Sequence, residues 1–243
     1  MFGTTPVRAS LAVTPVQAAR TASLDLSESA GGATLPAAAY LIDMTKPLHL
    51  IVVDDALAVF MHVHPELDAN GHFHMLLRLP HPGRYHVYAD AQLARYGHRV
   101  FRFDIAIGNG KRVVPTFGAP ARSVAIMGYT VSLDRTSLPA GADAVVRVAI
   151  DKNGRLARDL HPFLGAAAHA VFIHAGDLTY VHVHPMGAGG MDMPNMPSDQ
   201  PNKLEPAQLA LHVTLPERGA YKMWLEFRGG AEDIAAPFVI VAK

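Results

Sequence analysis

The stretch PLHLIVVDDALAVFMHVHP, residues 47–65, contains an apolar run, a short polar turn and a second apolar run that ends in His-Val-His-Pro. The stretch AAHAVFIHAGDLTYVHVHP, residues 167–185, repeats the same order. Two apolar runs joined by a short turn are typical of a β-hairpin. Because the hairpin occurs twice with the same ending, the sequence indicates an internal duplication.

A second pair of segments extends the duplication. LRLPHPGRYHVYAD (77–90) and HVTLPERGAYKMWLEF (212–227) share the pattern Leu-Pro-x-x-Gly-x-Tyr. The second copy has extra residues between its two segments, in MGAGGMDMPNMPSDQPNKLEPAQ (186–208), and GNGKRVVPTFGAPARS (108–123) breaks the strand pattern between the copies. We therefore predict a first repeat at residues 1–113 and a second at residues 122–243.

The polarity pattern predicts the fold class. ASLDLS, FRFDIAI, AVVRVAI and LALHVTL alternate with a period of two, and no long stretch has the period of an amphipathic helix. Short alternating strands separated by turn residues are typical of a β-sandwich. We predict an all-β chain of two tandem immunoglobulin-like β-sandwich domains. The alternative is one larger barrel built from both halves.

Composition excludes several classes of protein. The chain has 243 residues, a formal net charge of zero and no cysteine. Without a basic stripe we expect no nucleic-acid partner, and without cysteine there are no disulfides, thiolate nucleophiles or Cys-type zinc sites. No apolar run is long enough to cross a bilayer, so we do not expect a transmembrane protein. MFGTTPVRASLAVTPVQ at the start shows no signal peptide, which leaves cytoplasmic and exported locations open.

Histidine is unusually frequent, with fourteen in the chain, and it is the commonest metal-ligand side chain. On a strand, residues i and i+2 point the same way, so His62 and His64 share a face. A turn between Asp55 and Ala56 places His49 opposite His62. A register shift of one residue would move His49 to the other face.

The second copy has the same spacing. His182 and His184 share a face, and a turn between Ala175 and Gly176 places His169 opposite His182. Three neutral imidazoles on a two-stranded ribbon can bind one ion, and they suit Zn(II), Cu(II), Ni(II) or Co(II). The sequence therefore predicts a metal site in each copy. The alternative is that duplication copied histidines that only form hydrogen bonds, with His49 and His169 pointing away.

Methionines gather after the second His-Val-His-Pro, at Met186, Met191, Met193 and Met196. Methionine normally fills cores, whereas thioether sulfur in a polar segment suits Cu(I). The cluster therefore predicts Cu(I) capture near the second histidine group. The alternative is an ordinary disordered loop.

Further histidines of the first copy have no matching histidine in the second. His72 and His74 form a second His-x-His pair that the second copy lacks. We interpret His81, His86 and His98 as parts of a solvated strand face.

The segments HLIVVDDALAVFMHVHPE, LPHPGRYHVYAD, HAVFIHAGDLTYVHVHP and LPERGAYKMWLEF resemble a group of bacterial, mostly exported, immunoglobulin-like proteins with paired HVHP segments. The resemblance extends from about residue 40 to the end of the chain. It implies a periplasmic or secreted β-sandwich protein linked to copper and heavy-metal handling. The residues that it marks are His49, His62, His64, His169, His182 and His184.

The expected function is non-catalytic metal binding in metal handling, resistance or delivery, with copper as the expected ion and zinc as the alternative. A membrane metal transporter or a copper enzyme is the expected partner. A cupin-like mononuclear metal enzyme is a second hypothesis, because cupins also place His-x-His on a strand before a glutamate and a later histidine. Here Glu66 follows His64 too closely for that pattern, His86 occurs without the full pattern, and the second copy lacks both features. A structural module with incidental histidines, or with a pH switch, is the third.

Overall fold

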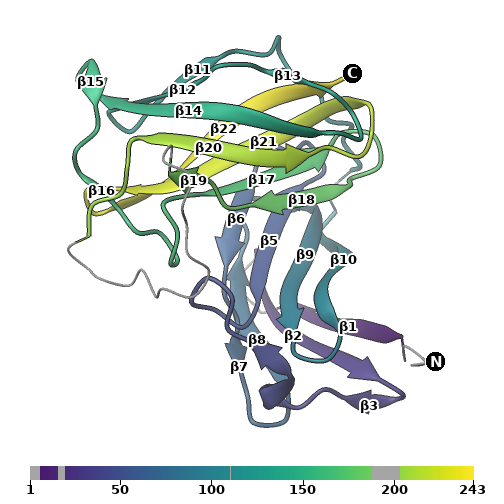
Figure 1. Ribbon diagram of the computed structural model, residues 1–243. Helices are drawn as coiled ribbons and strands as arrows, with labels where there is room; N and C mark the ends of the chain where they lie inside the picture. The colour runs from purple at the N-terminus through teal and green to yellow at the C-terminus, as the bar shows by residue number, and fades with distance from the viewer. Residues whose placement is uncertain (1–5, 16–19, 110, 188–202) are drawn as a thin grey trace. The chain divides into compact units, whose positions relative to one another are not determined.

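The chain forms two compact units, residues 1–116 and 117–243, and each is a sandwich of two sheets (Figure 1). The computed structural model describes residues 6–15, 20–109, 111–187 and 203–243. Both units are immunoglobulin-like β-sandwiches arranged in tandem, as predicted, so the alternative of one barrel built from both halves is wrong. Within these described ranges, no helix is long and apolar enough to cross a membrane.

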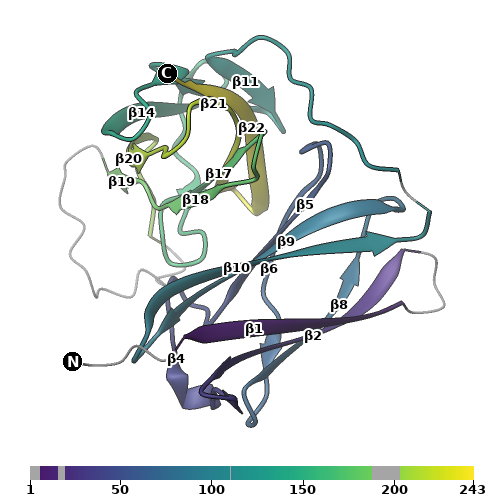
Figure 2. The ribbon, with the colours of Figure 1, turned by 90° about the vertical axis from the view of Figure 1, so that its right-hand side faces the viewer.

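The first unit pairs its strands in the orders β1-β2-β8-β7 and β10-β9-β5-β6, with β3 added beside β2 and β4 beside β9. Figure 2 shows β1 beside β2 in one sheet and β9 beside β10 in the other. The strands are β1 (Val7–Pro15), β2 (Thr21–Ala30), β3 (Ala33–Thr34), β4 (Tyr40–Leu41), β5 (His49–Asp54), β6 (Phe60–Val63), β7 (Glu66–Leu67), β8 (His72–Arg78), β9 (Gly83–Leu93) and β10 (Gly97–Ile107). A short 3₁₀ turn, η1 (Ala37–Ala39), precedes β4.

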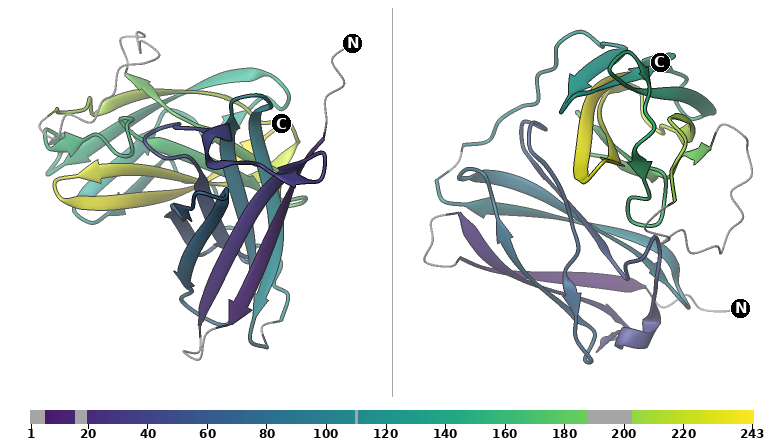
Figure 3. Two further views of the ribbon diagram at one scale, coloured as in Figure 1. Left: turned by 90° about the horizontal axis from the view of Figure 1, so that it is seen from below. Right: turned by 90° about the vertical axis from the view of Figure 1, so that its left-hand side faces the viewer.

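The second unit repeats this arrangement in the orders β11-β12-β14-β20-β19 and β13-β22-β21-β17-β18. Figure 3 gives two further views of the ribbon. Its strands are β11 (Ser123–Ile126), β12 (Tyr129–Leu133), β13 (Ser137–Leu138), β14 (Asp143–Lys152), β15 (Arg155–Leu156), β16 (Leu160–His161), β17 (His169–His174), β18 (Tyr180–Val183), β19 (Met186–Gly187), β20 (Gln208–Thr214), β21 (Gly219–Gly229) and β22 (Glu232–Ala242). The small strand β15 pairs with β14, and β16 pairs with β21, as β3 and β4 do in the first unit.

Each sandwich encloses its own apolar core. In the first unit, Leu24 from one sheet and Leu50 from the other lie in one buried cluster with Phe73. In the second unit, Phe172 and Phe227 belong to the corresponding cluster. Alternation along each strand supplies these side chains, and full burial of one large apolar side chain contributes about 1.5–3 kcal/mol.

The repeated Leu-Pro-x-x-Gly-x-Tyr pattern forms a tyrosine corner in both units. The Tyr85 hydroxyl donates to the carbonyl oxygen of His81 at 2.6 Å. The Tyr221 hydroxyl donates to the carbonyl oxygen of Glu217 at 3.1 Å. A hydrogen bond from a buried tyrosine back to the preceding turn is a hallmark of immunoglobulin-like sandwiches. The Leu-Pro-x-x-Gly-x-Tyr spacing that both units share therefore has a structural cause.

The hairpin register differs from the predicted one. Ile51 is opposite His62, and Leu50 is opposite Val63, so His64 rather than His62 is opposite His49. The second hairpin has the same register, with Val171 opposite His182. The shift is two residues, so the histidines stay on the predicted face.

The Asp54 side chain explains the shift in the first hairpin. Its Oδ1 accepts hydrogen bonds from the backbone N–H groups of Ala58 at 2.8 Å and Val59 at 2.9 Å. These bonds hold a five-residue loop between β5 and β6, where a tight turn at Asp55 and Ala56 was predicted.

Candidate metal centres

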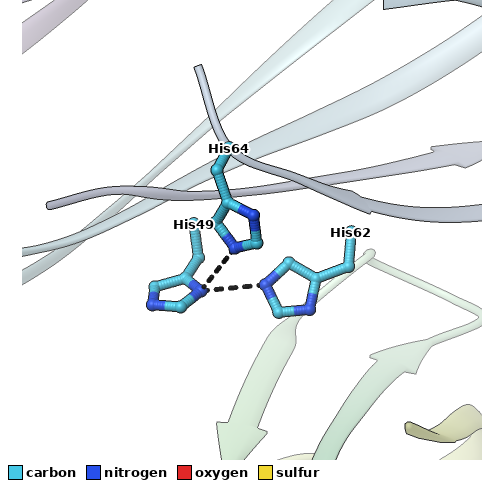
Figure 4. A group of neighbouring side chains, drawn as sticks. All are labelled: His49, His62 and His64. Atoms are coloured by element: carbon cyan, nitrogen blue, oxygen red, sulfur yellow. Dashed lines mark hydrogen bonds between the residues drawn. The ribbon is translucent and has the colours of Figure 1, made fainter. Parts of the chain in front are cut away.

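Three histidines of the first unit point their ring nitrogens at one another (Figure 4). His49 begins β5, His62 lies on β6, and His64 follows the end of β6. His49 Nδ1 lies 2.9 Å from His62 Nε2 and 3.2 Å from His64 Nε2. One ligand nitrogen from each of the three lies within 4.8 Å of the others, so they form a triad, which we call the first triad.

The backbone sets the orientation of His49. Its Nε2 lies 3.0 Å from the carbonyl oxygen of Asp43, and a carbonyl can only accept. Nε2 of His49 therefore carries the proton, and the lone pair on Nδ1 points toward His62 and His64. A hydrogen bond to the non-ligating nitrogen is the usual way in which proteins hold a histidine ready for a metal.

The second unit contains the same arrangement, which we call the second triad. His169 Nδ1 lies 3.1 Å from His182 Nε2, and His184 completes a group with ligand nitrogens within 4.8 Å of one another. His169 Nε2 lies 3.1 Å from the carbonyl oxygen of Phe163, so its Nδ1 also presents the lone pair. The structure therefore brings all six predicted histidines together as two triads.

The geometry fits one small ion in each triad. Two nitrogens that are each 2.0–2.1 Å from one ion lie about 3.3 Å apart in tetrahedral coordination and about 2.9 Å apart at a right angle. The nitrogen distances of 2.9, 3.2 and 3.1 Å fall close to this range. Three imidazoles leave a fourth position for water or another donor.

The residues that surround the triads are largely apolar, and a carboxylate lies nearby. On the same sheet face, Ile51 and Val171 are fully buried. Burial, together with the positive charges that its two partner imidazoles and Lys46 carry when protonated, lowers the pKa of His64 to about 3. Burial also raises the pKa of Glu226, which is opposite His169 on β21, to about 8.

Each triad depends on a tight turn with an unusual backbone. Asp43 and Lys46 bond to each other across a two-residue turn, as Phe163 and Ala166 do in the second unit. In the first turn Thr45 has φ 72°, whereas Gly165 has φ 82° at the matching place. A β-branched residue in this region is strained, so strain is stored beside the carbonyl that orients His49.

We expect Thr45→Gly to raise the free energy of unfolding by about 1 kcal/mol, because relief of strain outweighs the added freedom of the unfolded chain. Calorimetric unfolding of the full chain measures the change. Gly165→Ala is the matched control, and it is expected to lower stability by a similar amount, since alanine tolerates φ 82° poorly. A loss of stability in the Thr45→Gly variant would show that contacts of the threonine side chain offset the strain.

The other histidines of the first unit contact carboxylates instead of the first triad. His72 Nδ1 lies 2.9 Å from Asp25 Oδ1, and His74 Nε2 lies 3.3 Å from Asp68 Oδ2. His86 is only 5% exposed and lies between Asp55 and Asp104. The interpretation of His86 as part of a solvated face was therefore wrong.

The cupin hypothesis used Glu66 and His86, and neither joins the first triad. Glu66 lies on β7, in the opposite sheet from β6, and is opposite His74. His86 Nδ1 is 2.7 Å from Asp104 Oδ1. The glutamate and later histidine of a cupin site are therefore not assembled beside His62 and His64.

The methionine prediction falls largely outside the described residues. Met191, Met193 and Met196 lie in the range 188–202, and nothing is described there. Met186 begins β19, where its backbone pairs with Ala210 of β20. The proposed Cu(I) capture by these methionines remains a prediction.

Sequence reasoning missed two kinds of residue beside the triads. Asp90 is opposite His49 and Glu226 is opposite His169, on the same face as the triads. The signal was present, because Asp90 and Glu226 occupy matching places five residues after the repeated tyrosine. The carbonyl acceptors of Asp43 and Phe163 had no such signal, since any residue supplies a carbonyl.

The fold and the paired triads define a tandem immunoglobulin-like protein with two candidate metal centres. The chain belongs to the family described as "Domain of unknown function (DUF8832)", whose profile matches residues 5–108 and 123–243. The two matched segments agree with a tandem duplication. No curated protein matches the sequence.

Solved structures with some likeness include two-domain β proteins. The chain is 13% identical to a two fibronectin type-III domain segment of chicken tenascin, covering 96% of this chain and 98% of that one with a TM-score of 0.26. It is 8% identical to fibronectin(III)-like modules of CbhA from Clostridium thermocellum, covering 97% and 94% with a TM-score of 0.24. It is 12% identical to red sea bream transglutaminase with a TM-score of 0.27, covering 97% of this chain but spanning only 31% of the transglutaminase. At these scores, the likenesses carry no argument about function.

Proposed function

We propose that this protein is a non-catalytic metal-binding protein in which each histidine triad holds one ion. One observation carries the proposal: in both units, three imidazoles from a strand pair converge with ligand nitrogens within 4.8 Å of one another. A carbonyl fixes the ligand nitrogen of His49 and of His169. Incidental histidines on a strand face would have no need of this matched orientation.

Copper is the proposed ion, and zinc is the alternative. Imidazole donors suit both ions, and divalent copper binds nitrogen sites more tightly than zinc does. The chain has no cysteine to offer zinc a thiolate, and it has ten methionines, whose thioethers suit Cu(I). The resemblance to exported proteins with paired HVHP segments supports the same choice.

We propose a role in metal handling, resistance or delivery, in the periplasm or outside the cell. A membrane metal transporter or a copper enzyme is the proposed partner. Because a histidine must be neutral to bind a metal, acidification would release the ion. The triads have the donor set for reversible capture, and no additional acid or base is required for that role.

Titration of the metal-free protein with Zn(II) or Cu(II) is expected to show two ions bound per chain, one for each triad. Isothermal calorimetry measures the number and the affinity. Ion binding to the folded state is also expected to stabilise it, by about 2.7 kcal/mol when the free ion exceeds the dissociation constant 100-fold. A parallel titration with Cu(I) under a reductant compares the oxidation states.

A scrambled peptide of the same histidine content is the control. Binding no tighter than that of the peptide would contradict the proposal and support a structural module. One bound iron or manganese ion with oxygenase activity would instead support a metal enzyme.

A further inference from the structure

The interior of the first unit contains a buried acid. Glu28 lies on β2 in phase with Leu24 and Leu26, so its side chain points between the two sheets, and it is 0% exposed. Among the described residues, neither carboxyl oxygen of Glu28 has a hydrogen-bond partner. The hydroxyl of Tyr40, on β4, is buried in the same core and has no partner among them either. Buried polar groups are nearly always hydrogen-bonded, so this pair calls for an explanation.

The second unit shows that the fold does not require these two polar side chains. The carbonyl oxygen of Glu28 accepts a backbone hydrogen bond at 2.8 Å from the residue that follows β3, and that of Ile150 accepts one at 2.9 Å from the residue that follows β15. Tyr40 begins β4, and Leu160 begins the matching strand β16. The buried residues Ile150 and Leu160 therefore stand where the first unit has Glu28 and Tyr40.

The charges near Glu28 do not compensate it. Arg99 of β10 is the charged side chain that acts on Glu28, but its Nη1 donates to the carbonyl oxygen of His98 at 2.8 Å. On β1, the residue opposite Glu28 is Ala9. Burial therefore outweighs the attraction of Arg99 and raises the pKa of Glu28 to about 7. Burial, and then the charge of Glu28, raises the pKa of Tyr40, so the phenol stays neutral.

The segment next to this pair, residues 35–41, has few backbone bonds, and we call it the β4 segment. The strand β4 has two residues, which pair with β9. Other bonds that hold the segment run from the N–H of Leu35 to the carbonyl of Glu28 at 2.8 Å and from the N–H of Ala94 to the carbonyl of Ala39 at 2.9 Å. Short elements with few such bonds open at the lowest cost in free energy. Opening of the β4 segment is therefore the local motion that admits water to Glu28.

We propose that Glu28 is a pH-sensitive switch that opens the β4 segment when its carboxyl ionises. The switch acts within the first unit and needs no metal, so it does not depend on the proposed function. A neutral carboxyl stays in the core, whereas an ionised one without a partner is costly in an apolar interior, and the segment opens to hydrate it. The segment leads into the turn of Asp43, whose carbonyl orients His49, so the switch adjoins the support of the first triad.

Hydrogen exchange of the metal-free full chain, measured by mass spectrometry from pH 5 to pH 8 with a chelator present, tests the switch. The open state releases the proton of Glu28 above the ordinary pKa of 4.5, whereas the closed state keeps it up to about 7, so rising pH favours opening across this window. We expect exchange in residues 35–41, divided by that of Glu28→Gln at the same pH, to rise about tenfold from pH 5 to pH 8. The division removes the ordinary pH dependence of exchange and the effects of groups that both proteins share, such as His64.

The second unit is a matched control in the same chain. Residues 157–161, beside Ile150, are expected to exchange equally in the two proteins at every pH. Glu28→Ile, which copies the second unit, is expected to remove the pH-dependent rise as Glu28→Gln does. If neither variant folds, the unaltered chain still decides, because its residues 35–41 must gain exchange with pH more steeply than its residues 157–161. A ratio that stays constant from pH 5 to pH 8, or an equal rise in both segments, would overturn the proposal.

Discussion

His62→Ala is expected to reduce the number of tightly bound ions per chain from two to one, and His182→Ala is expected to do the same through the other triad. Each change removes one of three convergent nitrogens, and the remaining pair should bind about 100-fold more weakly or worse. Combining the two changes is expected to abolish tight binding. Calorimetry and equilibrium dialysis with metal analysis measure the number of ions.

A matched control exists in the same chain. His72 and His74 form another His-x-His pair, but they contact Asp25 and Asp68 instead of a third histidine. A variant with both changed to alanine is expected to retain two ions. Loss of an ion in that variant, or two ions retained by the His62→Ala and His182→Ala combination, would place the binding sites away from the triads.

The metal-free protein is expected to lose stability as the pH falls below about 6.5, and His64 should account for part of the loss. Its folded pKa is about 3, compared with an ordinary value of 6.5. Above pH 6.5 His64 is neutral in both states and has no effect. Between the two values the unfolded chain takes up a proton that the folded chain excludes, so the free energy of unfolding decreases toward acid.

For one proton, the free energy of unfolding can change by at most about 1.4 kcal/mol per pH unit. Partial exposure of His64 reduces the expected change to about 0.5–1 kcal/mol per pH unit. Urea unfolding at pH 7, 6 and 5 with a chelator present measures it. His64→Gln cannot take up this proton and should show a shallower dependence. His72 and His98 have raised pKa values and contribute in the opposite direction, but they are common to both proteins. Equal slopes for the two proteins would contradict the assignment.

Alternation and repetition in the sequence determined much of this protein. The period of two in segments such as FRFDIAI predicted strands, and the matching hairpins predicted tandem sandwiches. The same period placed His62 with His64, and His182 with His184, because successive side chains on a strand must alternate. The predicted register was wrong by two residues, but a shift of two residues leaves a side chain on the same face, so His49 was still placed on the correct face.

Only the tertiary structure decided which groups meet across strands. The bonds from Asp54 to the loop set the register, and the turn at Asp43 presents the carbonyl that orients His49. The pairing of β17 with β21 brings Glu226 beside His169 from far along the chain. The alternation of side chains along a strand is a property of neighbouring residues, so the sequence specifies the face on which each side chain lies. Strand pairing depends on loops and on contacts between distant segments, so only the fold specifies which residues lie opposite one another.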